Sequence, residues 1–448
     1  MIELIAFIGM TAFISAEGWI VAHRLLQGSY GKGFEILLGL PLGAVINLLG
    51  ILLLTIVGIS LNSISIVSVN LIATLILLIS VQPLLKAKSS IESSVDTLII
   101  VPKALVVLSG FIIAASLIFA VSHVLLPTFH YDSTTNWNMR SKVSYHRAEV
   151  VFDSQDGLVS KSNYPFLFHA LQISINQFSP NWSDKSANGI HLLLTLSCFG
   201  LLFSTIAKKG KFYALIVLAL LLGIPLMTLH AGQSYADITL VGFALLSLLM
   251  FIEFRKLDDS RLLMLSGVFL SACVWTKSDG LFFCYIPWII MVAIALVRHT
   301  GSIAHLRYPI GFSVIAAMTW PIFATVKELS LTPHGSGDAE IMLNIEAVSA
   351  FSSALFVTGS FGIYWYGLFS VLVVLLIGVR RGWDIAVDRR YFLTLLWGLI
   401  AMASYMGVYL LTSNTEYLII GQSFDRQMLL PASLLTLSLS YMVIPRRL

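Results

Sequence analysis

Lys277 and Asp279 place two charges in an otherwise apolar part of the chain, in the run Trp-Thr-Lys-Ser-Asp-Gly over residues 275–280. The apolar stretch before this run has only about 15 residues, which at roughly 1.5 Å each cover about 22 Å of a hydrocarbon layer about 30 Å thick. The turn is therefore expected below the membrane surface, where a charge lines a cavity or pairs with another charge. Lys277 is a candidate anion ligand, and its pairing with Asp279 is the structural alternative.

A second polar cluster surrounds Asp132, in the run His-Tyr-Asp-Ser-Thr-Thr-Asn-Trp over residues 130–137. It directly follows a long apolar stretch, so the carboxylate is expected near the headgroups of a bilayer. A carboxylate fixed there is well placed to act as a general base. Asp followed by Ser and Thr is equally good helix-capping chemistry, and the residues alone leave both roles open. Lys142, ten positions further on, is either a substrate contact or a solvated lysine.

A third cluster precedes the last apolar stretch and contains Arg426, whose planar guanidinium suits a phosphate. The alternative for Arg426 is an interfacial anchor. Its neighbours are Asn414, Glu416, Tyr417, Gln422, Ser423 and Asp425. Another polar pair, Tyr235 and Asp237, opens an apolar stretch. Asp338 and Glu340 are too weak a signal to predict a metal site, so no cofactor is predicted and metal dependence stays open.

The elements that position these clusters are apolar helices. Hydrophobic residues make up 57% and charged residues 11% of the 448 positions, a composition typical of a multi-spanning membrane protein. A spanning helix needs about 20 mostly apolar residues. We predict an all-α fold with about thirteen spans, near residues 2–22, 36–58, 64–82, 97–122, 188–207, 212–229, 236–254, 262–276, 281–297, 308–326, 349–379, 391–411 and 427–444.

The orientation follows from the basic residues, because Lys and Arg of short loops stay cytoplasmic. With the N-terminus outside, 19 of the 27 Lys and Arg residues fall on the inner side. The net charge of +4 therefore reflects topology, and we predict no nucleic-acid partner. All three polar clusters fall on the outer side. The inner loops carry no Gly-rich phosphate motif, which argues against a cytosolic nucleotide as substrate.

The longest outer segment covers residues 127–187. Asn163, Pro165 and the apolar pattern that follows predict one amphipathic helix there, and residues 137–151 predict a second. Helices of this kind tend to lie in the membrane interface with their apolar side toward lipid. We therefore expect a small outer module that rests on the bilayer.

Taken in order, these clusters make the chain similar to bacterial polyprenyl-phosphate-dependent glycosyltransferases of the GT-C fold class. The resemblance extends from about residue 104 to 444, and it implies a GT-C-like module over residues 97–448 behind an appended transmembrane bundle over residues 1–96. In that class the acidic loop usually follows the first span, whereas here it follows the fourth. The matching residues are Tyr131, Asp132, Trp137, Lys142, Tyr164, Pro165, Tyr235, Ala236, Asp237, residues 275–280 and residues 423–426.

The resemblance implies a function and a role for each matching residue. Asp132 would be the catalytic base, and Lys277 and Arg426 would bind the donor phosphate. The chain would transfer a sugar from a polyprenyl-phosphate-linked donor to an acceptor hydroxyl of a glycan, lipid or protein, on the outer side of a bacterial inner membrane. The alternatives are an envelope polysaccharide polymerase or ligase and a carrier of lipid-linked sugars. The remaining implied substrate contacts are Tyr131, Trp137, Lys142, Tyr164, Tyr235, Asp237 and Asp279.

Overall fold

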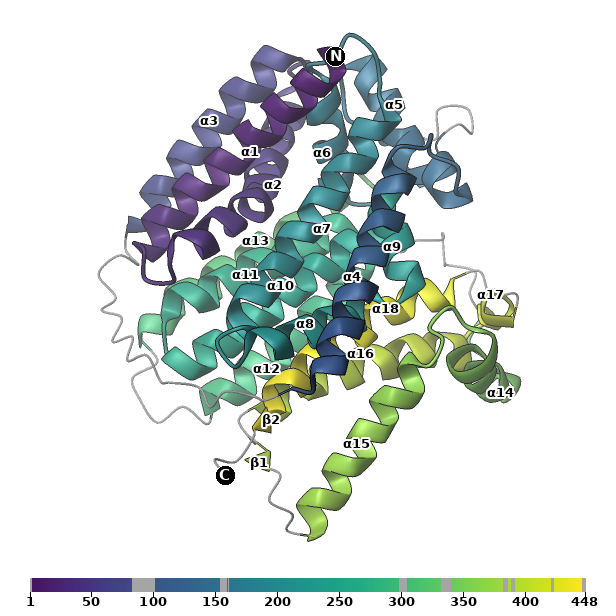
Figure 1. Cartoon of the computed structure of the whole chain (residues 1–448). Helices are drawn as coiled ribbons and strands as arrows, with labels where there is room; N and C mark the ends of the chain where they lie inside the picture. The colour runs from purple at the N-terminus through teal and green to yellow at the C-terminus, as the bar shows by residue number, and fades with distance from the viewer. Residues whose placement is uncertain are drawn as a thin grey trace.

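The computed structural model describes residues 2–82, 101–153, 159, 161–297, 304–331, 340–381, 386–387, 391–419 and 423–444. Within these ranges the chain is almost entirely helical (Figure 1), as the sequence predicts. The only strands in the described ranges are the two-residue β1 (Ala386–Val387) and β2 (Val443–Ile444), which pair antiparallel. The predicted domain boundary at residues 96 and 97 and the candidate metal ligand Asp338 lie outside the described residues.

The helices follow the apolar stretches of the sequence. In chain order they are α1 (Ile2–Leu26), α2 (Lys32–Val57), α3 (Ser63–Ser80), α4 (Lys103–Val124), α5 (Asn138–Arg147), α6 (Leu167–Asn176), α7 (Asp184–Ile206), α8 (Lys211–Leu222), α9 (Pro225–Gly232), α10 (Ala236–Leu257), α11 (Ser260–Thr276), α12 (Ile286–Val297), α13 (Arg307–Val326), α14 (Glu346–Ser353), α15 (Tyr364–Arg381), α16 (Phe392–Leu411), α17 (Thr415–Ile419) and α18 (Phe424–Met442). Shorter helical turns are η2 (Ser133–Trp137), η3 (Gly280–Tyr285), η4 (Ala304–Leu306) and η6 (Ala354–Thr358).

Nine helices in the described ranges are long and apolar enough to cross a membrane, so the chain has the helices of a polytopic membrane protein. A tenth candidate is the pair α8 and α9, which is bent by 78°. The bend falls where Pro225 begins α9, because proline cannot continue a preceding helix. The predicted span over residues 349–379 is divided at Gly359 into α14 with η6 and α15, and α15 extends away from the other helices in Figure 1.

The three N-terminal helices form a closely packed bundle (Figure 1). Glycines make the crossing of α1 and α2 tight: a Cβ on Gly18 would overlap backbone atoms of Gly39 and Gly43. Small residues allow such close backbone approach between membrane helices. Asn70 on α3 donates to Asn47 on α2 (3.1 Å), which also accepts a bond from Ser174 on α6 (2.8 Å). The bundle is therefore attached to the rest of the protein by a buried polar contact.

The centre of the protein is α10, which is buried along its whole apolar length. It packs against α7, α11 and α18, and α11 packs in turn against α13. Because α10 packs against both α11 and α18, the positions of the ends of these three helices relative to one another are defined by the packing. Those ends carry Asp237, Lys277 and Arg426.

The segment between α4 and α7 is folded into the protein, which corrects the prediction of amphipathic helices at the membrane interface. Every residue of α6 is buried, because α2, α5, α7 and α11 surround it. The buried residues of α5 are polar and include Arg140, which is fully buried. Its guanidinium donates to the carbonyl oxygens of Val151 (2.9 Å) and Tyr164 (2.7 Å). Burial lowers the pKa of Arg140 to about 9, which still leaves it charged at neutral pH.

Candidate active site

A cavity of about 770 Å³ lies where the segment after α4, the segment before α6, the start of α10, the turn after α11, one face of α16 and the start of α18 meet. It unites chain segments that the sequence places nearly 300 positions apart. The lining residues are Asp132, Asn136, Trp137, Lys161, Tyr164, Asp237, Lys277, Asp279, Phe282, Phe283, Ile286, Ile400, Ser404, Tyr405, Val408, Tyr409, Thr412, Asn414, Tyr417, Ser423, Arg426 and Gln427. One end of the cavity is ionic and the side walls are largely apolar or aromatic.

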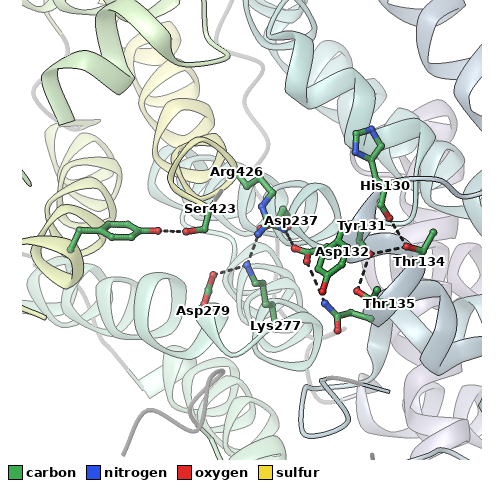
Figure 2. A network of polar contacts seen from close by, with 12 residues as sticks. His130, Tyr131, Asp132, Thr134, Thr135, Asp237, Lys277, Asp279, Ser423 and Arg426 are labelled. Carbon is green, nitrogen blue, oxygen red and sulfur yellow. Dashed lines mark hydrogen bonds and ion pairs between the residues drawn. The ribbon is translucent and has the colours of Figure 1, made fainter. Parts of the chain in front are cut away.

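The ionic end contains two cations held by three carboxylates (Figure 2). The Lys277 ammonium lies between Asp237 (2.8 Å) and Asp279 (2.9 Å), and all three side chains are at most 10% exposed. Arg426 donates from Nη1 to Oδ2 of Asp132. Charges buried to this degree attract one another strongly, because little water screens them. An anion that enters the cavity therefore meets Lys277 and Arg426 and must compete with their carboxylates, and a third cationic side chain, Lys161, also lines the cavity.

Asp132 forms an ion pair and does not cap a helix. It lies immediately before η2, but its side chain accepts no capping bond from a backbone N–H of that helix. One oxygen contacts Arg426 and the other accepts a long bond of 3.5 Å from the Asn136 amide. The capping alternative is therefore wrong, and the carboxylate is directed into the cavity, as Figure 2 shows.

The turn that carries Lys277 and Asp279 is shaped by Gly280. Lys277 ends α11 in an extended conformation, and Asp279 directly precedes η3. A Cβ on Gly280 would overlap the carbonyl group of Cys273 in the preceding helix. Only glycine allows η3 to lie this close to α11. The structure thus shows the pairing of Lys277 with Asp279 that the sequence offered as the structural alternative, and it adds Asp237 as a second partner of Lys277.

We expect Gly280→Ala to lower the free energy of unfolding by about 1 to 3 kcal/mol, because the added methyl group meets backbone that cannot move aside. Thermal unfolding of the purified protein in detergent measures the change. The matched control is Gly311→Ala in α13, where a Cβ would meet no atom within 4 Å. Equal midpoints for the two variants would show that the turn has room for a side chain.

Aromatic side chains pack against the ionic end of the cavity. The rings of Trp137, Tyr164 and Phe168 pack together with Tyr235, and Trp137 and Tyr164 have centroids 5.3 Å apart. Tyr235 stacks on His230 (3.9 Å) and lies under the guanidinium of Arg426 (5.6 Å). A cation over an aromatic face is held by the quadrupole of the ring. Burial raises the pKa of Tyr164 above its ordinary value, so its phenol remains protonated.

The apolar walls lead from the ionic end to the outside of the helix bundle. Phe282 and Ile286 lie on one wall and Val408 on the other, and these side chains are 44%, 46% and 37% exposed. Each therefore lines the cavity and also faces the surroundings of the helices. The cavity therefore has an apolar border on the outside of the helix bundle.

Most of the residues predicted from the sequence meet at this cavity. Asp132, Trp137, Tyr164, Asp237, Lys277, Asp279 and Arg426 line it, and Tyr235 lies directly behind Arg426. The structure does not bring Tyr131 and Lys142 to it. Tyr131 is 77% exposed, and Lys142 is exposed on α5, outside the cavity lining.

Sequence reasoning missed two tyrosines and one lysine. Tyr405 and Tyr409 are four positions apart on α16, which places both on one helix face. The Tyr405 hydroxyl donates to Asp279 (3.4 Å), and that of Tyr409 donates to Gln427 (2.7 Å). Their spacing within an apolar span was the available signal. Lys161 also lines the cavity, and its position depends on the fold of the segment before α6.

No group of three or more His, Cys, Asp and Glu side chains in the described ranges is arranged to hold a metal ion. Each of the three carboxylates that line the cavity forms an ion pair, Asp132 with Arg426 and both Asp237 and Asp279 with Lys277. The charged side chains of the cavity offer anion binding by Lys277 and Arg426 beside a carboxylate able to accept a proton.

The fold and the cavity define a polytopic membrane protein with a partly buried ionic site open to an apolar surface. No protein-family model, curated protein or solved structure matches the chain.

Proposed function

We propose that this chain is a glycosyltransferase of the GT-C type that takes its sugar from a polyprenyl-phosphate-linked donor and transfers it to a hydroxyl of the cell envelope. The observation that carries the proposal is the cavity itself, in which Lys277, Arg426 and Asp132 form one end of an apolar channel that is exposed on the helix bundle. A lipid phosphate has the same division into an anionic end and an apolar chain. The two cations would bind the phosphate, and the walls formed by Phe282, Ile286 and Val408 would contact the chain.

The proposed reaction is a displacement at the anomeric carbon. Asp132 accepts the proton of the acceptor hydroxyl as the oxygen bonds to the anomeric carbon. The bond between that carbon and the phosphate oxygen breaks, and polyprenyl phosphate leaves with the bonding electrons. Lys277 and Arg426 stabilise the negative charge that develops on the phosphate.

The ion pair between Arg426 and Asp132 implies that the donor binds before Asp132 acts as the base. While Arg426 donates to Asp132, one oxygen of the carboxylate is occupied and is not free to accept the proton of an acceptor hydroxyl. A donor phosphate competes for the guanidinium, with which it can form two parallel bonds. Donor binding would thus release the carboxylate, so that the base becomes active only when the donor is in place.

The proposal includes a topology of about thirteen spans in a bacterial inner membrane, with the cavity on the outer side. Alkaline phosphatase is active only outside the cytoplasm, so fusions near Gly157 or Gly335 should be active and fusions near Lys209 or Gly382 should be inactive. The sorting of basic loops is the physical reason. Activity of the Lys209 fusion would reverse the orientation and place the cavity on the cytoplasmic side.

A deletion strain tests the function in the cell. Mass spectrometry of its envelope glycans should show one sugar missing from one glycan, together with accumulation of the lipid-linked donor. A polymerase or ligase would instead leave complete repeat units that are unjoined or unattached. If the glycans and the lipid-linked donors are unchanged, none of the three functions (transferase, polymerase or ligase) is supported.

A further inference from the structure

The segment that carries Asp132 is closed at its two ends by one carboxylate, that of Asp184. At the start of the segment the backbone N–H of Thr128 donates to Oδ2 of Asp184 (3.2 Å). At its end the side-chain amide of Asn138 donates to Oδ1 (2.9 Å) and also to the Thr128 hydroxyl (2.9 Å). Asp132 lies between these two anchors. Asp184 therefore contacts both ends of the segment from Thr128 to Asn138 through its two oxygens.

Asp184 is itself held rigidly. It is the first residue of α7, where the helix N-terminus favours a negative charge. The indole N–H of Trp182 donates to Oδ1 (2.7 Å), which directs the carboxylate toward the segment. No ion pair of Asp184 is formed with the described Lys, Arg or His side chains, so its bonding capacity is used for this segment and for Trp182.

A second side chain, Gln233, contacts the start of the same segment. Gln233, in the connection between α9 and α10, accepts a bond from the backbone N–H of Phe129 (3.3 Å) and donates to the carbonyl oxygen of His123 (2.9 Å). It joins the end of α4 to the start of the segment. Gln233 contacts only that start, whereas Asp184 contacts both ends of the segment that carries Asp132.

We propose that Asp184 is a positioning residue that fixes the segment carrying Asp132 and so holds the carboxylate at the distance its reaction requires. The catalytic consequence rests on the proposed function, whereas the effect on the segment does not. Asp184 is absent from the cavity lining and acts through the segment. A general base works within about 2.6 to 3.2 Å of the proton it accepts. A displacement of about 1 Å can cost about 10²-fold in rate.

The test is Asp184→Asn, which preserves size but offers one acceptor oxygen in place of two. The matched control is Asp153→Asn, the same change at an exposed position of the same outer segment. Hydrogen exchange followed by mass spectrometry measures protection of the backbone amides over residues 128–138. Donor-titration kinetics measure kcat and the donor KM.

We expect Asp184→Asn to increase exchange over residues 128–138 and to lower kcat at least about ten-fold, with the donor KM within about two-fold of wild type. The control should change neither. In an Asp132→Asn background the same substitution should lower the residual rate less than two-fold, because its effect passes through Asp132. Asn138→Ala, which removes the bonds to Asp184 and to the Thr128 hydroxyl but leaves the bond from the Thr128 backbone to Asp184, should show the same pattern more weakly and serves if Asp184→Asn does not fold.

If hydrogen exchange over residues 128–138 is unchanged in Asp184→Asn and in Asn138→Ala, the inference is overturned, whatever reaction the protein performs. Raised exchange with an unchanged kcat in an active protein would also overturn it, as would an equal loss of rate with and without Asp132. If wild-type protein transfers no sugar, the proposed function fails, and the exchange measurement still decides whether Asp184 fixes the segment.

Discussion

Replacing Asp132 by Asn should lower the turnover of sugar transfer by 10²-fold or more, the usual loss when a general base is removed. Asn preserves the size of the side chain and cannot accept the proton. The donor affinity should not fall, because Arg426 loses its carboxylate partner and is more available to the phosphate. Steady-state kinetics with a titrated lipid-linked donor separate kcat from donor binding.

The control for this variant is Asp153→Asn at an exposed position, which should retain wild-type kinetics. Asp132→Asn should also retain its thermal unfolding midpoint within a few degrees, because the amide oxygen of Asn can still accept the bond from Arg426. A variant that keeps more than about a tenth of the wild-type turnover would show that Asp132 is not the base.

Removing either cation should weaken donor binding and lower turnover together. We expect Arg426→Gln to cost about 10²-fold in kcat/KM, comparable to the loss of one charge-stabilising donor in other enzymes. Lys277→Met should cost as much, and it also leaves Asp237 and Asp279 buried without a cation. Breaking a buried pair in this way destabilises a protein by about 3 to 5 kcal/mol.

The loss of stability and the loss of donor binding that Lys277→Met causes can be separated. In the double variant Lys277→Met with Asp237→Asn, one buried carboxylate is neutralised, so part of the stability should return while donor affinity stays low. Lys327→Met, at an exposed lysine, is the matched control. Combining Lys277→Met with Arg426→Gln should cost less than the two single losses added, because both side chains act on one phosphate. Strictly additive losses with intact donor binding would assign Lys277 and Arg426 purely structural roles.

The features that depend on short stretches of sequence could be predicted. Each apolar stretch predicted as a span contains helix in the structure, because about 20 apolar residues are a local property. The burial of Lys277 agrees with the short apolar stretch before it, whereas its depth in a membrane stays a prediction. Its pairing with Asp279 was the structural alternative, because the two residues share one turn.

The features that depend on packing could not be predicted. Asp237 contacts Lys277 only because α10 packs against α11, and Asp132 meets Arg426 across a separation of 294 positions. The burial of Arg140 could not be predicted, because its partners are backbone carbonyls, which no sequence pattern marks. The apolar pattern of α6 was assigned to lipid, whereas neighbouring helices cover it. A pattern identifies an apolar face but does not identify what covers that face.

The most direct test of the account is turnover of defined donors by purified protein in lipid nanodiscs, with an envelope extract as the acceptor and mass spectrometry as the readout. Sugars linked to a polyprenyl monophosphate are compared with the same sugars linked to a polyprenyl diphosphate. The account predicts that wild-type protein releases polyprenyl phosphate from a monophosphate donor as the acceptor gains one sugar, and that Asp132→Asn protein binds this donor without consuming it. Failure to bind or consume any monophosphate donor, or consumption of diphosphate donors alone, would contradict it.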